Sequence, residues 1–200
     1  MTVTSKIKIL HEAGLQYAAI EIPYYTSSSD DTELVKVEGT TYNLLDGQLT
    51  KTPLGKGHVY DEVVRKNRSV KKIAFPNVQV GSVIELRYTV QTKRFFSTRP
   101  WRFQKTIPVR HSVLTLVANP FYTYAFILKG ADKFDSYTAV DDSFDTQFLA
   151  VKYKNTTYKF VMNNLPAFRD EEFLPNTADY MIALYFEMSK YYSYSMSKYM

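Results

Sequence analysis

The sequence predicts an all-β protein, an antiparallel β-sandwich with little or no helix. The clearest observation is residues 83–91, where apolar and mostly polar positions alternate with a period of two. The apolar positions of this stretch are Ile84, Leu86, Tyr88 and Val90. Aromatic residues make up 16% of the 200 residues, and aromatic rings suit pleated surfaces. Asp46-Gly47 adds the strongest hairpin signal in the chain.

Short strands divided by turns are expected through the first half of the chain. Pro23 should end the second of these strands, and Gly39 should separate the third from the fourth. Gly55-Lys56-Gly57 is expected to be a turn, because the frame of a phosphate-binding loop is missing around it. Residues 26–32 are expected to be a solvated loop rather than a calcium site. The expected strands are 6–10, 16–22, 34–37, 40–44, 48–52 and 59–64.

The central stretch, residues 71–91, is expected to be a strand, a turn and a second strand, with breaks at Phe75-Pro76-Asn77 and at Gly81-Ser82. Residues 131–146 are expected to be a polar loop. Residues 180–188 fit a helix or a buried strand, and the aromatic residues favour a strand. The other expected strands are 113–117 and 121–128, then 149–153 and 157–162 as a hairpin. The chain is thus expected to form a single domain over 1–188, with a linker or tail over 189–200.

Composition limits the chemistry that the chain can perform. There is no cysteine, which removes disulfides, thiolate metal sites and a cysteine nucleophile. The three histidines, His11, His58 and His111, lack metal-ligand spacing, so no metal and no cofactor are expected. No run is long and apolar enough for a membrane span, and Met1–Leu10 lacks the apolar core of a signal peptide.

Catalysis is not expected of this chain by itself. No Gly-x-Ser-x-Gly elbow occurs, and each histidine is more typical of a surface residue than of a base. The acidic cluster Asp170-Glu171-Glu172 leaves a hydrolase open as a third hypothesis, although such loop acids are usually solvated.

Positive charge is concentrated in one window. Between Arg65 and Arg110 there are twelve Lys or Arg and one acid, Glu85, in a chain of net charge +5. Such asymmetry favours an anionic partner or an intramolecular docking face. Arginine beside aromatic rings can stack on bases or sugars, but Trp101 can equally anchor a corner of the sandwich while the arginines lie in water. The candidate interaction face is Arg87, Arg94, Arg99, Trp101 and Arg102.

Several motifs occur in the order of a known bacterial family. They are Phe75-Pro76-Asn77-Val78, Gly81-Ser82-Val83-Ile84-Glu85 with Tyr88, Lys8-Ile9-Leu10 with Gly14, residues 39–44 with Asp46-Gly47, Trp101 with 103–104 and 107–109, and residues 164–168 with 171–175. In this order they resemble a domain of unknown function, of Bacteroidetes type, that lies upstream of transglutaminase-like domains in envelope proteins. The resemblance spans about residues 7–188.

The resemblance implies a non-catalytic β-sandwich module of a larger exported protein. Such a module would pack on a downstream transglutaminase-like, protease-like domain or present substrate to it. A periplasmic or cell-envelope location follows, with the signal peptide absent from this sequence, rather than the cytoplasm. A protein or glycan ligand is expected and nucleic acid is not, although binding of an anionic polymer through residues 65–110 is the alternative function. Such binding would weaken steeply with salt.

Overall fold

The computed structural model describes residues 1–27, 32–92, 99–148, 151–169 and 179–191. The predicted all-β fold is confirmed, since nearly every element of these segments is an antiparallel strand. The chain divides into two compact units, Met1–Phe95 and Phe96–Met200, and each has its own core. Whether the two units unfold together, as the predicted single domain over 1–188 would, stays a prediction.

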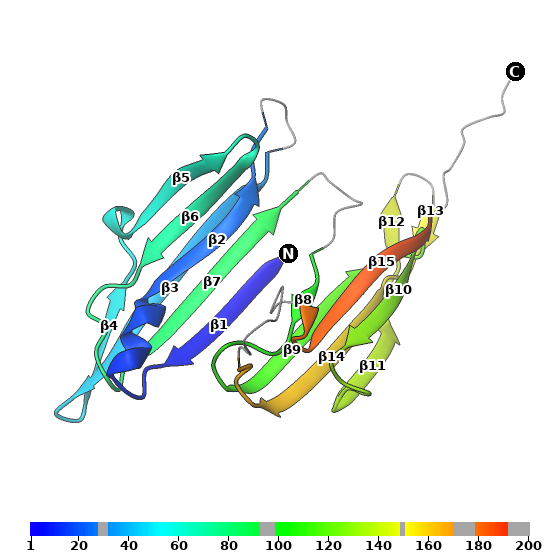
Figure 1. Ribbon diagram of the computed structural model, residues 1–200. Helices are drawn as coiled ribbons and strands as arrows, with labels where there is room; N and C mark the ends of the chain where they lie inside the picture. The colour runs from blue at the N-terminus through cyan, green and yellow to red at the C-terminus, as the bar shows by residue number, and fades with distance from the viewer. Residues whose placement is uncertain (28–31, 93–98, 149–150, 170–178, 192–200) are drawn as a thin grey trace, which may run out of the picture. The chain divides into compact units, whose positions relative to one another are not determined.

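Unit 1 is a two-layer antiparallel sandwich (Figure 1). One sheet has the strand order β1-β7-β3-β4 and the other the order β2-β6-β5. The strands are β1 (Thr2–Lys8), β2 (Ala19–Tyr25), β3 (Leu34–Leu45), β4 (Gln48–Pro53), β5 (Val59–Arg65), β6 (Arg68–Ala74) and β7 (Val83–Gln91). Two short 3-10 helices, Glu12–Ala18 and Lys56–His58, occupy connections between strands.

The alternation of β7 builds the core of unit 1. Ile84 and Leu86 are 1% and 3% exposed, and they pack against Ile22 and Ile73 of the opposite sheet. Tyr88 packs against the same core, so the predicted apolar face of β7 is confirmed. Burying each aliphatic side chain contributes roughly 1.5–3 kcal/mol, which makes this contact between sheets the main reason that the layers hold together.

The motif around Phe75–Ser82 forms a loop that is closed by side-chain hydrogen bonds. The Ser82 hydroxyl donates to Asn43 Oδ1, and Asn43 Nδ2 donates to the Asn77 carbonyl over 2.8 Å. Ser82 and Asn43 are 0% and 6% exposed, so these bonds satisfy polar groups that would otherwise be costly to bury. Asn77 and Gly81 adopt left-handed backbone angles, φ 54° and 93°, which explains the residue types at the two turns.

Two predicted breaks in unit 1 are wrong. Gly39 lies inside the continuous strand β3, where a Cβ would come within 2.7 Å of both Leu54 Cδ1 and Phe75 Cε1. This glycine is therefore needed for close packing and not for a turn. Pro23 also lies inside a strand, β2. Proline is tolerated there because β2 is an edge strand, where a missing backbone N–H costs little. The expected second strand also starts later, since residues 16–18 belong to a 3-10 helix.

Unit 2 is built from three antiparallel sheets, with strand orders β10-β15-β8, β11-β14-β9 and β12-β13. Its strands are β8 (Trp101–Arg102), β9 (Val109–Ala118), β10 (Tyr122–Lys129), β11 (Ser136–Asp141), β12 (Thr146–Phe148), β13 (Val151–Tyr153), β14 (Thr156–Leu165) and β15 (Ala183–Tyr191). Phe103, Phe160 and Leu184 are the most deeply buried side chains between the two larger sheets. Aromatic rings dominate this core, with Phe126, Phe134 and Phe186 among those packed around it.

The predicted strand at residues 180–188 is confirmed in kind and lies at Ala183–Tyr191. Two other predictions for unit 2 are wrong. Residues 131–146 contain β11, which the sequence does not reveal because all six of its residues are exposed. Residues 149–153 and 157–162 do not form a hairpin: β13 pairs with β12, while β14 pairs with β11 and β9.

Candidate interaction surfaces

The structure does not gather the predicted basic face on one element. Arg87 is exposed on β7 of unit 1, opposite Glu38 and Thr4 on the neighbouring strands. Arg99 is exposed in unit 2, where Trp101 and Arg102 form β8. Arg94 lies outside the described residues. The residues of the candidate face are thus divided between the two units, and the face stays a prediction.

The corner formed by β8 is a packing feature. Trp101 packs against the core of unit 2, and its Nε1 donates to Ser112 Oγ over 3.3 Å. Arg102 is half-buried rather than lying in water as expected, and its Nε finds no hydrogen-bond partner among the described residues. Burial lowers the pKa of the Lys105 ammonium, and the positive charge of Arg102 lowers that pKa further. Trp101 therefore anchors this corner as the structural interpretation predicts, but Arg102 is part of it.

The basic window is partly neutralised by acids from other strands. Lys71 binds Asp61, and Lys72 binds Glu62 over 2.6 Å with Glu21 at 3.8 Å. As neighbours on β6, Lys71 and Lys72 point to opposite faces of the sheet. Lys71 and Lys72 therefore present their charges on opposite faces, each beside an acid, and the anionic polymer stays an alternative prediction for the window as a whole.

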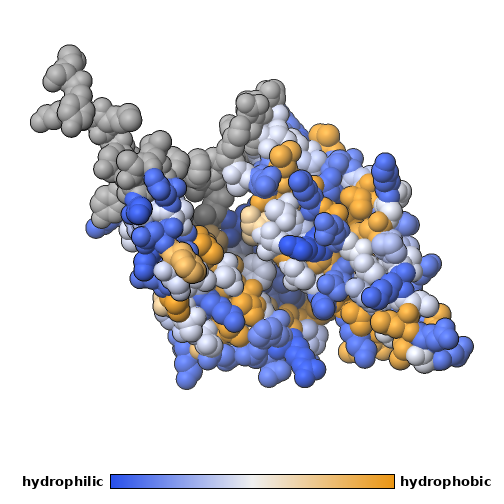
Figure 2. Space-filling view, turned by 180° about the vertical axis from the view of Figure 1, so that it is seen from behind, coloured by the Kyte–Doolittle hydropathy of each residue, from blue (hydrophilic) through white to orange (hydrophobic). Residues whose placement is uncertain are grey.

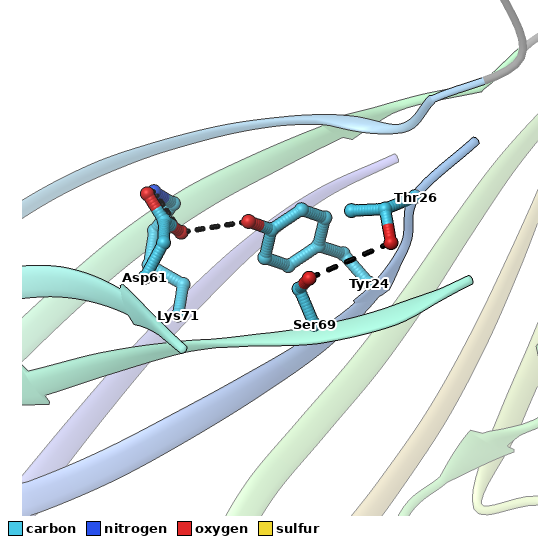
Figure 3. Close-up of polar contacts among 5 residues, drawn as sticks. All are labelled: Tyr24, Thr26, Asp61, Ser69 and Lys71. Atoms are coloured by element: carbon cyan, nitrogen blue, oxygen red, sulfur yellow. Dashed lines mark hydrogen bonds and ion pairs between the residues drawn. The ribbon is translucent and has the colours of Figure 1, made fainter. Parts of the chain in front are cut away.

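A polar network spans β2, β5 and β6 (Figure 3). Tyr24 Oη donates to Asp61 Oδ1 over 2.9 Å, and Lys71 Nζ lies 2.7 and 2.9 Å from the two Asp61 oxygens. The Lys71 ammonium also lies 5.9 Å from the centroid of the Tyr24 ring. Beside them, Ser69 Oγ donates to Thr26 Oγ1 over 3.5 Å.

The network lies where the inner face of the sheet β2-β6-β5 emerges from the sandwich. Lys71 shares its face of β6 with the buried Ile73, yet its partner Asp61 has a side chain that is 52% exposed. Burial would raise the pKa of Asp61, but bonds from Lys71 and Tyr24 outweigh it and hold that pKa below its ordinary value. Burial raises the pKa of the Tyr24 hydroxyl, and the hydrogen bond to Asp61 and its negative charge raise that pKa further. Neither group is therefore poised to exchange a proton near neutral pH, and the network ties three strands together.

Tyr24, Asp61 and Lys71 are not recognisable as a group from the sequence. They are separated by 37 and 10 positions along the chain, and only the register of β5 on β6 brings Asp61 opposite Lys71. No hairpin was expected between β5 and β6, so the opposite charges of Asp61 and Lys71 gave no signal in the sequence.

The histidines take local structural roles. The Gly55 backbone N–H donates to His58 Nδ1 over 2.9 Å within a short turn. His111 Nδ1 donates to Asn163 Oδ1 over 2.6 Å between β9 and β14. His11 is exposed just before the first 3-10 helix. In the described part of the chain, no group of three or more acidic or histidine side chains is placed to hold a metal ion.

Unit 2 has a hollow of about 440 Å³ beside its aromatic core. Phe160 is one of the lining residues, and the ring centroids of Phe126, Phe134 and Tyr137 lie 5.1, 5.0 and 5.1 Å from its own. Asp132 and Lys133 complete the lining, and both are exposed. Ligand pockets typically have volumes of this order and combine apolar walls with a few polar groups.

A second exposed apolar feature is the end of the β3–β4 hairpin. Pairing of β3 with β7 ends at Tyr42, so the hairpin continues as a two-stranded ribbon beyond it (Figure 1). Asp46 and Gly47 have φ angles of 48° and 78°, both positive as in a type I′ turn, and the hairpin predicted at this pair is confirmed. The leucine tip consists of Leu44, Leu45 and Leu49, which are 69%, 50% and 60% exposed. Figure 2 shows apolar surface among polar residues at this corner of unit 1.

None of the helical segments within the described ranges has the length and apolar character that crossing a membrane requires.

Comparison with solved structures finds the same fold in a longer chain. The match is a crystal structure of "a putative protease from Parabacteroides distasonis", with a TM-score of 0.71 and 18% sequence identity. It covers 94% of this chain but only 36% of that one, so this chain spans about a third of the matched protein. No curated protein matches the chain.

A family model covers most of the sequence. It is described as a domain of unknown function with solved structure, and it matches residues 1–169. This agrees with the family that the ordered motifs resemble. The chain therefore belongs to the DUF3857 family of domains of unknown function.

Proposed function

We propose that this chain is a non-catalytic interaction module of a larger, exported, protease-like protein. In that protein it packs on a transglutaminase-like catalytic domain or presents substrate to it. The observation that carries the proposal is the coverage of the structural neighbour: the fold takes up 36% of a chain described as a putative protease. In that protein the fold is one part of a longer chain, so its role there is exercised beside other parts.

The residues available in the chain support a non-catalytic role. The sequence has no cysteine, and the side chains of His58 and His111 are engaged in local hydrogen bonds. The pKa shifts of Asp61 and Tyr24 both favour the protonation state already present at neutral pH. Catalytic acids and bases have pKa values shifted in the other sense, toward neutrality.

The leucine tip is the surface best suited to contact a neighbouring domain. Its three leucines are 50–69% exposed, whereas the aliphatic residues Ile84, Leu86 and Val90 of β7 in the same unit are buried. Lys51 lies 5.8 Å from the centroid of the Tyr42 ring at the base of the ribbon, which adds a polar border to the apolar end. Apolar centres with polar borders are typical of protein interfaces.

Hydrogen–deuterium exchange of residues 42–51 tests this role in the isolated chain and in the full-length protein. We expect slower exchange of the hairpin in the full-length protein, because docking would cover it. Combined Leu44→Ser and Leu49→Ser substitutions should abolish that protection without unfolding the isolated chain. The control is Val63→Ser, a still more exposed apolar position of the same unit, at 79%.

Equal exchange of the hairpin in both forms would remove the leucine tip as the contact. Peptide hydrolysis by the isolated chain would contradict the non-catalytic role itself. Cell fractionation of the full-length protein tests export separately, with recovery in the cytoplasm as the contrary outcome.

A further inference from the structure

We propose that the free edge of β11 and the aromatic hollow beside it bind an extended basic peptide with one bulky apolar side chain. The peptide would add as a further strand beside β11 and place that side chain among Phe126, Phe134, Tyr137 and Phe160. The hydrogen-bonding edge, the hollow and the local charge each support a different part of this assignment.

The edge supplies unused backbone groups. β11 is an outer strand of the sheet β11-β14-β9, and within the described ranges no strand pairs with its other side. The backbone N–H of Asp142 donates to the Asn155 carbonyl over 2.8 Å. With the register of β11 on β14, this bond shows which residues of β11 direct their backbone groups toward β14 and which direct them away. Tyr137, Ala139 and Asp141 consequently direct their N–H and C=O groups away from β14. An extended peptide satisfies such groups by adding a strand.

The inner side of β11 is uncovered as well. Tyr137 shares a face with the core residue Phe160, which it opposes directly, yet it is 51% exposed. Ala139, two positions along on the same face, is also exposed. A side chain of an added strand would therefore lie over the hollow of about 440 Å³ instead of meeting a packed core.

Local charge decides which peptide fits. Residues 132–145 carry five aspartates and one lysine, in a chain whose net charge is +5. Three of these aspartates have neutral hydrogen-bond partners: Asp135 accepts from Asn163, Asp141 from Thr156 and Asp142 from Asn155. Their negative charges are not cancelled by these contacts, so they favour Lys or Arg in the peptide.

This inference shares one assumption with the proposed function, namely that the module presents peptides to a neighbouring catalytic domain. Binding is measured on this chain alone, whereas the proposed packing is measured in the full-length protein. Failure of either one is therefore visible without the other.

Nuclear magnetic resonance titration provides the test. The probe is the acetylated and amidated hexapeptide Lys-Thr-Phe-Thr-Lys-Thr, whose Lys and Phe side chains share one face of a strand. We expect shifts and slower exchange at the amides of Tyr137, Ala139 and Asp141. Replacing Phe by Ala, or both Lys by Glu, should weaken binding at least about tenfold, a factor that corresponds to about 1.4 kcal/mol. Added salt should weaken it too.

Substitutions on β11 separate the edge from the hollow. Ala139→Pro removes a donor that faces away from β14, so the fold should persist while binding is lost. Tyr137→Ala removes one wall of the hollow and should weaken binding at least about tenfold. Val140→Ala, on the other face of the same strand and 62% exposed, should leave affinity unchanged. If Ala139→Pro unfolds the chain, Tyr137→Ala and Val140→Ala still decide the result.

Three outcomes would overturn the proposal. The first is the absence of shifts at β11 with the Lys-Phe peptide. The second is equal binding of the Glu peptide. The third is equal affinity of the Tyr137→Ala and Val140→Ala variants.

Discussion

The two units build their hydrophobic cores from different kinds of side chain. The core of unit 1 is mainly aliphatic, with Ile9, Ile22, Ile73, Ile84 and Leu86 beside a single buried phenylalanine, Phe75. The core of unit 2 is mainly aromatic and centres on Phe103 and Phe160. Branched aliphatic side chains interdigitate between two sheets, and unit 1 encloses them between its layers.

The core of unit 2 differs also in having a hollow lined by aromatic rings. Phe160 contacts its neighbours at centroid distances of 5.0–5.1 Å, with interplanar angles of 34–62°. Tilted rings of this kind contact through edges and faces. Tyr137, which also lines the hollow, is 51% exposed, so the ring cluster is open beside it. The aliphatic core thus provides a closed support, whereas the aromatic core leaves apolar rings accessible to a ligand.

Truncation of Phe160 is the strongest way to test this contrast. Phe160→Ala should cost about 3–5 kcal/mol, because the ring is 1% exposed and three other rings pack against it. Trp101 is the only tryptophan in the chain and packs against this core, so its fluorescence reports on unit 2 during urea unfolding. Phe144→Ala is the control, at 85% exposure, and should change little. An equally small effect of both would mean that the aromatic cluster does not hold unit 2 together.

Truncation of Leu86 tests unit 1 in the same way. Leu86→Ala should cost about 2–5 kcal/mol, since the side chain is 3% exposed between the sheets. Arg87→Ala, the next residue and exposed, should cost under about 1 kcal/mol. Far-ultraviolet circular dichroism should show the loss, while the Trp101 transition stays in place. A matching shift of the Trp101 transition would instead support the single cooperative domain over 1–188.

Gly39 offers a smaller test of how tightly unit 1 is closed. Gly39→Ala should cost about 1–3 kcal/mol, because the added Cβ would lie 2.7 Å from Leu54 Cδ1 and 2.8 Å from Phe75 Cζ. Gly57→Ala is the matched control, since nothing lies within 4 Å of its added Cβ. Thermal unfolding of the two variants compares them directly. Equal melting temperatures would show that the aliphatic core can accommodate the added methyl group without loss of stability.

The smallest expected effect concerns Asp61 and pH. The folded pKa of Asp61 lies below its unfolded value, so the carboxylate stabilises unit 1 above about pH 4. This contribution is lost as the pH falls through the folded pKa. Asp61→Asn should therefore cost under about 1 kcal/mol at neutral pH, because the side chain is half exposed, and the difference should narrow in acid. Urea unfolding at several pH values measures it, and a difference that widens in acid would contradict the assigned shift.

Local patterns predicted much of unit 1 correctly. The period-two stretch gave β7 and its buried face, and Asp46-Gly47 gave the hairpin turn with its left-handed angles. Gly39 and Pro23 misled the prediction, because their roles depend on neighbours that are distant in sequence. Gly39 admits Leu54 and Phe75, and Pro23 is tolerated because β2 lies at an edge.

The candidate surfaces were less predictable for the same reason. Arg87, Trp101 and Arg102 stood out because basic and aromatic residues occur close together in sequence, yet the structure assigns them to different units. Tyr24, Asp61 and Lys71 come together only through strand register. The strand β11 lacks any apolar period because both of its faces are exposed, and that same exposure makes it a candidate docking edge.

The pairing of β1 with β7 has a consequence for how unit 1 reaches its native state. The first strand of the unit pairs with its last, from Thr2 opposite Thr89 to Lys8 opposite Val83. During synthesis β1 leaves the ribosome long before its partner exists, so it must stay unpaired until nearly the whole unit has followed. Sheets that join distant segments fold in milliseconds to seconds, much more slowly than local hairpins. The β5–β6 hairpin, by contrast, can form early, and β1 closes its sheet late.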